Sequence, residues 1–278
     1  MAGDPETRFA FGENWKAFLG TMNEDRIASA ERSLEAMLGQ GTLAGRTFLD
    51  VGCGSGLFSL AARRLGARVH SFDYDRQSVE CAEVLRQRFR PSDDDWRIEQ
   101  GSVLDTAYIA GLGTFDIVYS WGVLHHTGAM WQALDNVRPA VASGGRLIVA
   151  IYNDQGFQSV CWRAIKRVHN CLPHWLRTPY AIMVAIPFEA ALAVHALIKL
   201  EPSRYLRLWT GYSVRRGMSH WHDMIDWVGG YPFEVARPEA IVDFYRRTGF
   251  EPIQVKTCGR KLGCNEFVFV AAGAGPSR

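Results

Sequence analysis

The chain has few of the features that mark secreted, metal-binding or nucleic-acid-binding proteins. Its six cysteines are scattered without a C-x-x-C pair, so they predict reduced thiols in place of a disulfide framework. The formal net charge is only +2, whereas a nucleic-acid-binding domain usually carries a basic stripe and a higher isoelectric point. The N-terminus carries Asp4, Glu6 and Arg8 and lacks the apolar run of a secretory signal. We therefore expect a cytoplasmic protein.

The rest of the composition is that of a globular protein. Hydrophobic residues make up 47% of the chain and charged residues 22%, which is ordinary for a folded soluble domain. A length of 278 residues allows one large domain, or one domain with an insertion.

The most informative segment is residues 48–59, which read FLDVGCGSGLFS. The apolar start is typical of a strand covered on both faces. Three glycines then follow in a turn that opens a helix. Because glycine lets the backbone approach a ligand closely, the segment predicts a site for a nucleotide-type cofactor.

The spacing of these glycines favours one type of ligand. A dinucleotide-binding turn has the pattern G-x-G-x-x-G, but here the third glycine comes one residue early. Asp50 precedes the turn; its carboxylate would repel a pyrophosphate and suits an ammonium group. Asp73 ends the next strand, 21 residues after Gly52, where an acceptor for ribose hydroxyls belongs. We expect a ligand with a ribose and a cation, and a nicotinamide-dependent dehydrogenase is the alternative.

Elements of two kinds alternate along the chain. Helical segments are expected at 15–22 and 25–38, before the first strand. Strands are expected near 47–51, 68–73, 96–100, 115–120 and 146–151, with helices at 57–65, 76–89, 106–112 and 130–142. A helix at 238–248 and strands at 250–257 and 266–271 close the pattern. Strands that alternate with helices predict an α/β fold, with a doubly wound, mostly parallel sheet.

Five sequence blocks in this order resemble the class I S-adenosylmethionine-dependent methyltransferases. They are DVGCGSG at 50–56, FDYD at 72–75, EQGSVLD at 99–105, FDIVYSWGVLHHT at 115–127 and GGRLIVAIYN at 144–153. Within that family the chain is most similar to bacterial small-molecule methylases of the quinone and glycan-cluster type. The segment SHWHDMIDWVGGYPFE at 219–234 looks like the mark of one subgroup. The resemblance implies a seven-stranded Rossmann-like sheet whose last strand is antiparallel.

The resemblance also implies the cofactor, S-adenosyl-L-methionine, and its product S-adenosyl-L-homocysteine. It assigns cofactor binding to Asp50, Gly52, Gly54, Asp73, Tyr74, Ser102, Val103, Ser120 and Trp121. Asp73 would accept hydrogen bonds from the ribose, Tyr74 would lie near the adenine, and Asp50 would act on the ammonium through the turn. The two glycines would line the methionine and ribose part. Many relatives have an acid where this chain has Ser102, so the contact to the adenine amino group is in doubt.

Three parts of the chain are expected to have separate roles. Residues 1–45 form an N-terminal helical lid, 46–153 and 232–273 the cofactor-binding domain, and 154–231 a helical insertion that binds the substrate. After Asp154, the insertion holds nine Lys and Arg residues against four acids. This excess would attract an anionic substrate or membrane surface, or it belongs to a solvated helical face.

Residues 180–198 are apolar nearly all round. Pro187, Glu189 and His195 interrupt the run, and a transmembrane span tolerates a central carboxylate poorly. A membrane span, an interfacial helix that touches lipid and a buried cap or oligomer helix all remain open.

Methyl transfer requires alignment of the acceptor, exclusion of water and, for an alcohol or phenol, removal of a proton. The candidate bases are His126, which follows the fourth strand, and His220 and His222 in the insertion. His126 can instead shape the pocket floor. The two insertion histidines have the spacing of metal ligands, which Asp223 would extend, but no further protein ligand is found to complete a site, so no metal is expected.

Ser120 and Trp121 would hold the aminoacyl part of the cofactor. We expect Arg215 and Arg216 to hold an acidic group of the acceptor, and Trp15 and Tyr152 to contact it. Phe11 and Trp15 are read as lid residues.

The sequence thus predicts a methyltransferase that acts on a small or amphipathic metabolite. Oxygen is the favoured acceptor atom, because histidines are available as bases at the expected edge of the sheet. Methylation of nitrogen or carbon is one alternative, and a cofactor-binding partner subunit without catalysis is another. The acceptor can be anionic or lipid-linked; no nucleic acid is expected, and homo-oligomerisation is left open.

Overall fold

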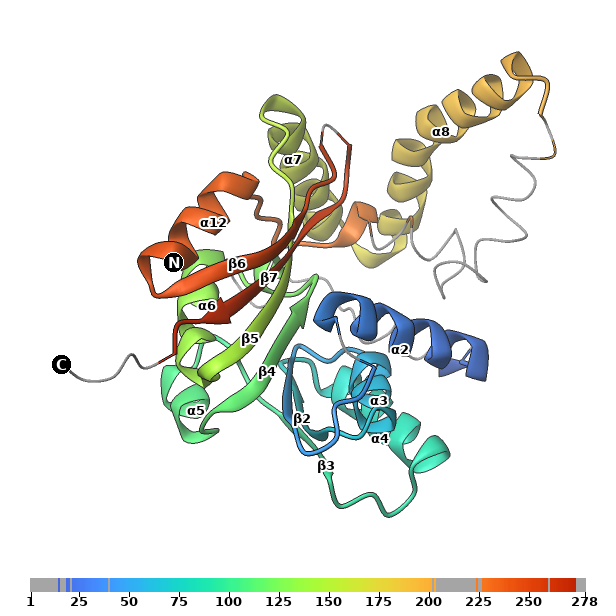
Figure 1. Ribbon diagram of the computed structural model, residues 1–278. Coiled ribbons are helices and arrows are strands. Elements are labelled where there is room, and N and C mark those ends of the chain that lie inside the picture. The colour runs from blue at the N-terminus through green and yellow to red at the C-terminus, as the bar shows by residue number, and fades with distance from the viewer. Residues whose placement is uncertain are drawn as a thin grey trace.

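The computed structural model describes residues 15, 19–20, 22–39, 41–201, 203, 224, 227–259 and 261–273. A seven-stranded sheet forms its centre, with the strand order β3-β2-β1-β4-β5-β7-β6 (Figure 1). The strands are β1 Thr47–Val51, β2 Arg68–Asp73, β3 Trp96–Gln100, β4 Phe115–Trp121, β5 Val141–Tyr152, β6 Phe250–Lys256 and β7 Cys264–Ala271. The first five are parallel, and β7 runs antiparallel to both β5 and β6. The predicted fold class is confirmed.

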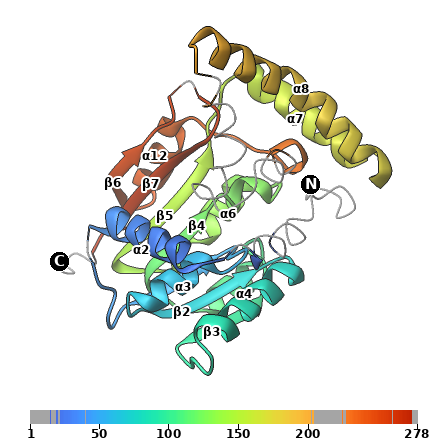
Figure 2. The ribbon, with the colours of Figure 1, turned by 90° about the vertical axis from the view of Figure 1, so that its right-hand side faces the viewer.

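Helices cover both faces of the sheet, because successive strand residues point to opposite sides. On one side Leu49 packs in a cluster with α5 Thr106–Gly111, α6 Met130–Asn136 and α12 Pro238–Arg247. On the other side its neighbour Phe48 packs with α2 Glu24–Leu38, α3 Leu57–Arg64 and α4 Arg76–Phe89. Figures 1 and 2 show the two layers of helices. The central strand β1 is therefore buried on both faces.

The helix at 130–142 was predicted too long. Helix α6 ends at Asn136, and Pro139 lies in a 3₁₀ turn over Arg138–Ala140. Proline lacks the N–H that an α-helix would need at that point. Strand β5 then begins at Val141, five residues before the predicted start at 146, with a register shift opposite Phe115 and Ile117.

Helix α2 is fixed to the sheet domain. The Arg64 guanidinium donates to both carboxylate oxygens of Glu24, at 2.5 and 2.9 Å. Near the other end of the helix, Arg146 donates to the carbonyl oxygen of Leu38. Within the predicted lid 1–45, Trp15 is the one described residue that lines the cavity discussed below. The role of residues 1–45 as a lid stays a prediction.

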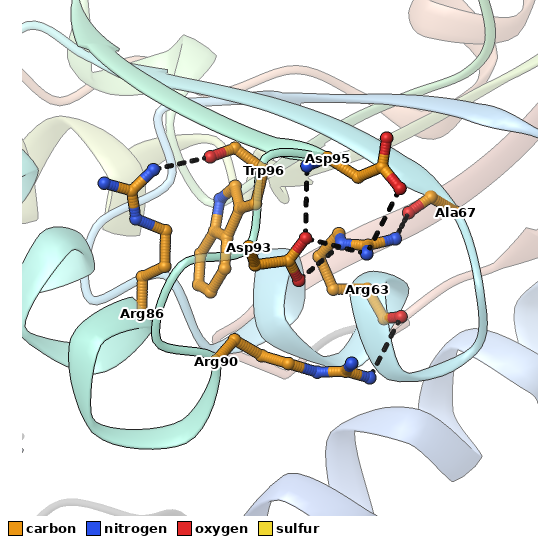
Figure 3. A network of polar contacts seen from close by, with 7 residues as sticks. All are labelled: Arg63, Ala67, Arg86, Arg90, Asp93, Asp95 and Trp96. Atoms are coloured by element: carbon orange, nitrogen blue, oxygen red, sulfur yellow. Dashed lines mark hydrogen bonds and ion pairs between the residues drawn. The ribbon is translucent and has the colours of Figure 1, made fainter.

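A polar network fixes the loop that leads into β3 (Figure 3). The Arg63 guanidinium donates to both carboxylate oxygens of Asp93, at 2.9 and 2.8 Å. Although burial alone would raise the pKa of Asp93, its hydrogen bonds with Arg63 hold that pKa below the usual value. Arg86 donates to the carbonyl oxygen of Trp96 at 2.8 Å. The network therefore fixes the start of β3 and with it the position of the Trp96 indole.

Among the described residues, two long helices lie between β5 and α12. Helix α7, Phe157–Cys171, and helix α8, His174–Ile198, run side by side (Figure 2). The Tyr180 hydroxyl donates to the carbonyl oxygen of Ile165 at 3.2 Å and joins the two. In the described part of the chain, α8 is the one helix long and apolar enough to cross a membrane, and only 17% of its most apolar window is buried. A cap helix buried within its own chain is therefore excluded.

Candidate cofactor and active site

A cavity of about 340 Å³ opens at the carboxyl ends of β1, β2 and β4. This is the edge of the sheet at which doubly wound folds bind ligands. The predicted cofactor residues on its lining are Asp50, Gly52, Gly54, Asp73, Tyr74, Ser102, Val103 and Trp121. Trp15 and His126 line it as well. The structure thus brings together residues that lie more than a hundred positions apart in the sequence.

The glycine-rich turn is held by the next strand. The amides of Gly52 and Cys53 both donate to the carbonyl oxygen of Phe72, at 2.9 and 3.1 Å. Gly52 has a φ of 76° and Gly54 a φ of 52°, which is the left-handed region that favours glycine. A Cβ on Gly54 would come within 2.9 Å of the Trp15 indole. The turn therefore depends on glycine for both its conformation and the space above it.

Asp73 is held in one orientation by two backbone amides. Its Oδ2 accepts from the amide of Gly54 at 2.9 Å, and its Oδ1 from the amide of Asp75 at 2.9 Å. A carboxylate oxygen has two lone pairs and can accept from more than one donor. A fixed, half-buried carboxylate of this kind suits a pair of neighbouring hydroxyls.

Asp50 lies deeper and receives a chain of hydrogen bonds. The Trp96 indole N–H donates to the Ser71 hydroxyl at 2.9 Å, and the Ser71 and Ser59 hydroxyls lie 2.7 Å apart. Ser59 then donates to Asp50 at 2.5 Å. Burial raises the pKa of Asp50 to about 7; the Ser59 hydrogen bond opposes this shift and the nearby charge of Asp73 adds to it. A cation bound in the cavity would favour the ionised carboxylate.

Stacked aromatic rings form one wall of the cavity. Phe58 stacks on Tyr119 with ring centroids 5.0 Å apart, and Tyr119 stacks on Trp121 at 5.9 Å. All three rings belong to the cavity lining. This wall supplies an apolar surface that excludes water from the reacting groups.

Ser102 and Ser120, both predicted to contact the cofactor, have backbone partners. The Ser102 hydroxyl lies on the cavity lining and accepts from the amide of Leu104 at 3.2 Å. The Ser120 hydroxyl is buried and donates to the carbonyl oxygen of Val51 at 3.0 Å. Ser120 is not part of the cavity lining. Its side chain instead joins the ends of β4 and β1 beside the turn.

The two adjacent histidines differ in environment. His126 Nδ1 lies 2.6 Å from the carbonyl oxygen of Pro232. Because a carbonyl oxygen only accepts, Nδ1 carries the hydrogen, and Nε2 is the basic nitrogen of the neutral ring. His125 is fully buried, and burial lowers its pKa well below the usual value. His126 is thus the member of the pair that combines a fixed tautomer with a place on the cavity lining.

Tyr152, predicted to bind substrate, is not part of the cavity lining. Its ring centroid lies 4.0 Å from that of His125 and 5.3 Å from that of His126, perpendicular to the latter ring. Phe233 packs against it at 5.3 Å. Tyr152 therefore supports the histidine pair.

Sequence reasoning missed the role of residues 231–234, YPFE. Besides the Pro232 carbonyl, the Glu234 amide donates to the carbonyl oxygen of His125 at 3.0 Å. The Glu234 carboxylate accepts from the Met130 amide at 2.9 Å and so caps helix α6. In the sequence, the only signal for this role was the subgroup motif. The structure now gives the last residues of that motif a function. They position the loop that carries both histidines.

Several predicted residues lie outside the described residues. They are Phe11, Arg215, Arg216, His220, His222 and Asp223. Their predicted roles as lid, acceptor-binding residues, bases and metal ligands stay predictions.

Comparisons with known proteins agree with this site. Residues 49–147 match the methyltransferase domain family. The ribosomal protein L11 methyltransferase of Thermotoga maritima is 44% identical over 77 residues, which cover 27% of this chain and 26% of that protein. The ubiquinone biosynthesis O-methyltransferase of Caulobacter sp. K31 is 28% identical over 141 residues, or 49% of this chain and 51% of that protein. The chain thus spans about a quarter of the first relative and about half of the second.

Among solved structures, magnesium protoporphyrin IX methyltransferase from Synechocystis PCC 6803, with bound SAH, has the same fold. The TM-score is 0.56 at 14% identity, over 94% of both chains. The sheet and its glycine-rich edge define the class of proteins that bind a nucleotide-type cofactor on a Rossmann-like fold. Within that class, residues 49–147 match the methyltransferase domain family, and the fold of the chain is shared with a methyltransferase.

The residues of the cavity fit S-adenosylmethionine. Gly54 lies on the cavity lining without a Cβ, and the Trp15 indole packs against it there. Asp73 would hold the ribose hydroxyls and Asp50 lies where a cationic ligand is favoured. The aromatic wall of Phe58, Tyr119 and Trp121 would enclose the reactive end.

Proposed function

We propose that this protein transfers a methyl group from S-adenosylmethionine to an oxygen atom of a small or amphipathic metabolite, with His126 as the base. The observation that carries the proposal is the hydrogen bond from His126 Nδ1 to the Pro232 carbonyl oxygen, at 2.6 Å. It makes Nε2 the basic nitrogen of a ring on the cavity lining.

Bound S-adenosylmethionine supplies an electrophilic methyl group on a sulfonium with an excellent leaving group. The chain's own residues then have two tasks. The aromatic wall and Trp15 orient the acceptor and exclude water. Alignment of the acceptor with the methyl group lowers the barrier. His126 Nε2 takes the proton of a hydroxyl or phenol as the oxygen is methylated, which is the role of a general base.

The names of the relatives support a small acceptor. The Caulobacter relative is called an O-methyltransferase of ubiquinone biosynthesis, and it aligns over 141 residues. The alignment to the Thermotoga relative, named for a ribosomal protein, covers only 77 residues. The local excess of basic residues in the insertion favours an anionic group on the acceptor. Arg215 or Arg216 would hold it, since arginine engages a carboxylate or phosphate bidentately.

The test is a search for the methylated product. The full chain is incubated with S-adenosylmethionine carrying a deuterated methyl group and with a metabolite extract of its own host. Mass spectrometry should then find a compound that gains the labelled methyl group on oxygen. Label on nitrogen or carbon would refute the proposed acceptor atom. Complete absence of labelled product, together with activity only after a second protein is added, would favour a partner subunit.

A further inference from the structure

Helix α7 buries a polar stripe and exposes an apolar one. Its buried positions are Ser159, Trp162, Lys166, His169 and Asn170, four of which are polar or charged. Its outward positions follow at helical spacing and are Phe157, Val160, Cys161, Ala164 and Val168, all exposed. Phe157 leaves 81% of its surface open. This is the reverse of the pattern expected for a helix whose outer face meets water.

Helix α8 continues this apolar surface. Its buried residues are the small ones, Ala181, Ala185 and Ala196. Its large side chains are exposed, namely Ile182, Met183, Ile186, Phe188, Leu192, Val194, Leu197 and Ile198. A contiguous apolar patch of this kind marks an interaction site. We refer to the outward residues of α7 and α8 together as the hairpin surface.

We propose that the hairpin surface docks onto an anionic lipid bilayer, with α8 lying in the plane of one leaflet. Charge supports this choice of partner. From residue 157 to 199, besides the buried Lys166, the chain has four basic residues that are exposed or half-buried, Arg163, Arg167, Arg177 and Lys199, and one acid, Glu189. Arg163 and Arg167 are exposed next to the outward stripe of α7. Basic residues beside an inserted apolar face attract anionic headgroups.

A second copy of the chain fits the hairpin surface less well. Interfaces between proteins have an apolar core with a polar rim, whereas most exposed residues of α8 are apolar, with His174, Thr178 and His195 as the polar ones. Two copies facing each other would also bring basic residues of like sign together, which opposes association. Trp175, exposed at the start of α8, is of the type enriched at the boundary between lipid and water.

The chain topology favours an in-plane helix over a membrane span. By residues 227–229 the chain is back against α7, where Asn170 Nδ2 donates to the carbonyl oxygen of Gly229 at 2.6 Å. If α8 crossed the bilayer, residues 200–226 would have to cross back. That stretch contains four arginines, Arg204, Arg207, Arg215 and Arg216, each costly in hydrocarbon.

The hairpin surface is connected to the active site by packed aromatic rings. Tyr152, which supports His126, lies 5.5 Å from Trp227 between ring centroids. Trp227 contacts Trp162 of α7 at 5.4 Å, and Trp162 contacts Phe188 of α8 at 5.4 Å. These contacts place the hairpin surface next to the residues that support the histidine pair, so docking would bring the active site close to an acceptor with a lipid-soluble part. This last step rests on the proposed function; the docking itself does not.

Vesicle flotation with the full chain tests the docking. We expect the protein to float with vesicles of three parts phosphatidylcholine to one part phosphatidylglycerol, and at least about tenfold less with phosphatidylcholine alone. Ile186→Glu should lower flotation by at least about tenfold. Val84→Glu on α4 is the matched control, because Val84 is 56% exposed and Ile186 59%. It should float like the wild type.

Affinity for S-adenosylhomocysteine reports on folding and on the cofactor site independently of lipid. If Ile186→Glu binds it poorly, Leu197→Glu, which is 62% exposed in the wild type, replaces it. The proposal is overturned if the wild type does not float, or if a folded Glu variant floats equally well. It is also overturned if light scattering shows a lipid-free dimer that the Glu variant dissociates while no form binds vesicles. Loss of S-adenosylhomocysteine binding in the wild type would refute the proposed function and leave the docking standing.

Discussion

Asp73 and Asp50 line the same cavity, but their carboxylates have different surroundings. Asp73 accepts from two backbone amides and is half-buried. Asp50 is buried with a serine hydroxyl as its hydrogen-bond donor. The first is therefore built to accept hydrogen bonds from a ligand in one orientation. The ionisation of the second, Asp50, depends on the charges near it.

Replacement of Asp73 tests the ribose site. Asp73→Asn removes the charge and turns one acceptor oxygen into a donor, so S-adenosylhomocysteine should bind about 10- to 100-fold more weakly by calorimetry. Asp116→Asn is the matched control, because Asp116 also accepts from a backbone amide at 2.9 Å, that of Thr47. Asp116 lies at the opposite edge of the sheet, so Asp116→Asn should bind S-adenosylhomocysteine like the wild type. Equal affinity of the Asp73 variant would contradict the assignment.

Asp50 predicts a pH dependence of stability in the ligand-free protein. Its pKa is raised to about 7 in the fold, against about 3.9 in an unfolded chain. The folded state therefore holds a proton that the unfolded state releases. This contribution is present below pH 4 and is lost as the pH rises to about 7.

The Asn side chain in Asp50→Asn cannot ionise, so the variant should not lose this contribution to stability as the pH rises. Compared with the wild type, urea unfolding of the variant should show a smaller drop in free energy of unfolding between pH 5 and pH 8. The slope removed is at most about 1.4 kcal/mol per pH unit. Identical pH profiles for the two proteins would mean that Asp50 is ionised in the fold.

His126 carries the catalytic prediction at this scale. His126→Ala should lower turnover by roughly 10²- to 10⁴-fold, the range for loss of a general base. Affinity for S-adenosylhomocysteine should stay within about twofold, because no hydrogen bond to Asp73 or the turn changes. Turnover is followed with the acceptor found by isotope labelling. Full turnover in this variant would leave His220 or His222 as the base.

At the scale of elements, the glycine-rich turn also allows close packing against helix α4. Gly56 has a φ of 79°, and a Cβ there would lie 3.1 Å from the Ala82 Cα of helix α4. Because that neighbour is backbone, the clash cannot be relieved by a side-chain rotation. Gly56→Ala should therefore lower the free energy of unfolding by about 2 to 4 kcal/mol, from the backbone conformation and overpacking together.

Gly39 provides the control for that variant. Its φ is 63°, but nothing lies within 4 Å of the position its Cβ would take. Gly39→Ala should cost only the conformational part, about 1 to 2 kcal/mol. Equal losses in the two variants, measured by urea unfolding, would show that α3 and α4 do not pack as described.

The elements were largely predictable because their signals are local. Strand β1 and its turn follow from an apolar run and three glycines, and α12 from a proline at its start. The end of α6 was missed because Pro139 was included in a helical run. The clamp on His126 was not predictable, since its partner Pro232 lies 106 residues away and spacing carries no information about that contact. The outward apolar faces of α7 and α8 became visible only once their buried sides were known.

At the scale of the whole molecule, the cofactor cavity and the start of the hairpin surface both lie at the carboxyl edge of the parallel strands. The cavity opens where β1, β2 and β4 end, and α7 begins five residues after the end of β5. The aromatic rings between Tyr152 and Phe188 fill the space between the two. The proposed reaction therefore takes place along one edge of the sheet. Asp73 lies at the nucleoside end of that edge, and His126 lies at the end where the acceptor would be methylated.

A crystal structure of the protein grown with S-adenosylhomocysteine tests this central claim most directly. The account predicts the ligand in the cavity, with both ribose hydroxyls within hydrogen-bond distance of Asp73, at about 2.5 to 3.0 Å. Its sulfur should face the part of the cavity lined by His126 and Trp121. A ligand bound elsewhere, or bound with its sulfur directed toward Tyr74, would contradict the account.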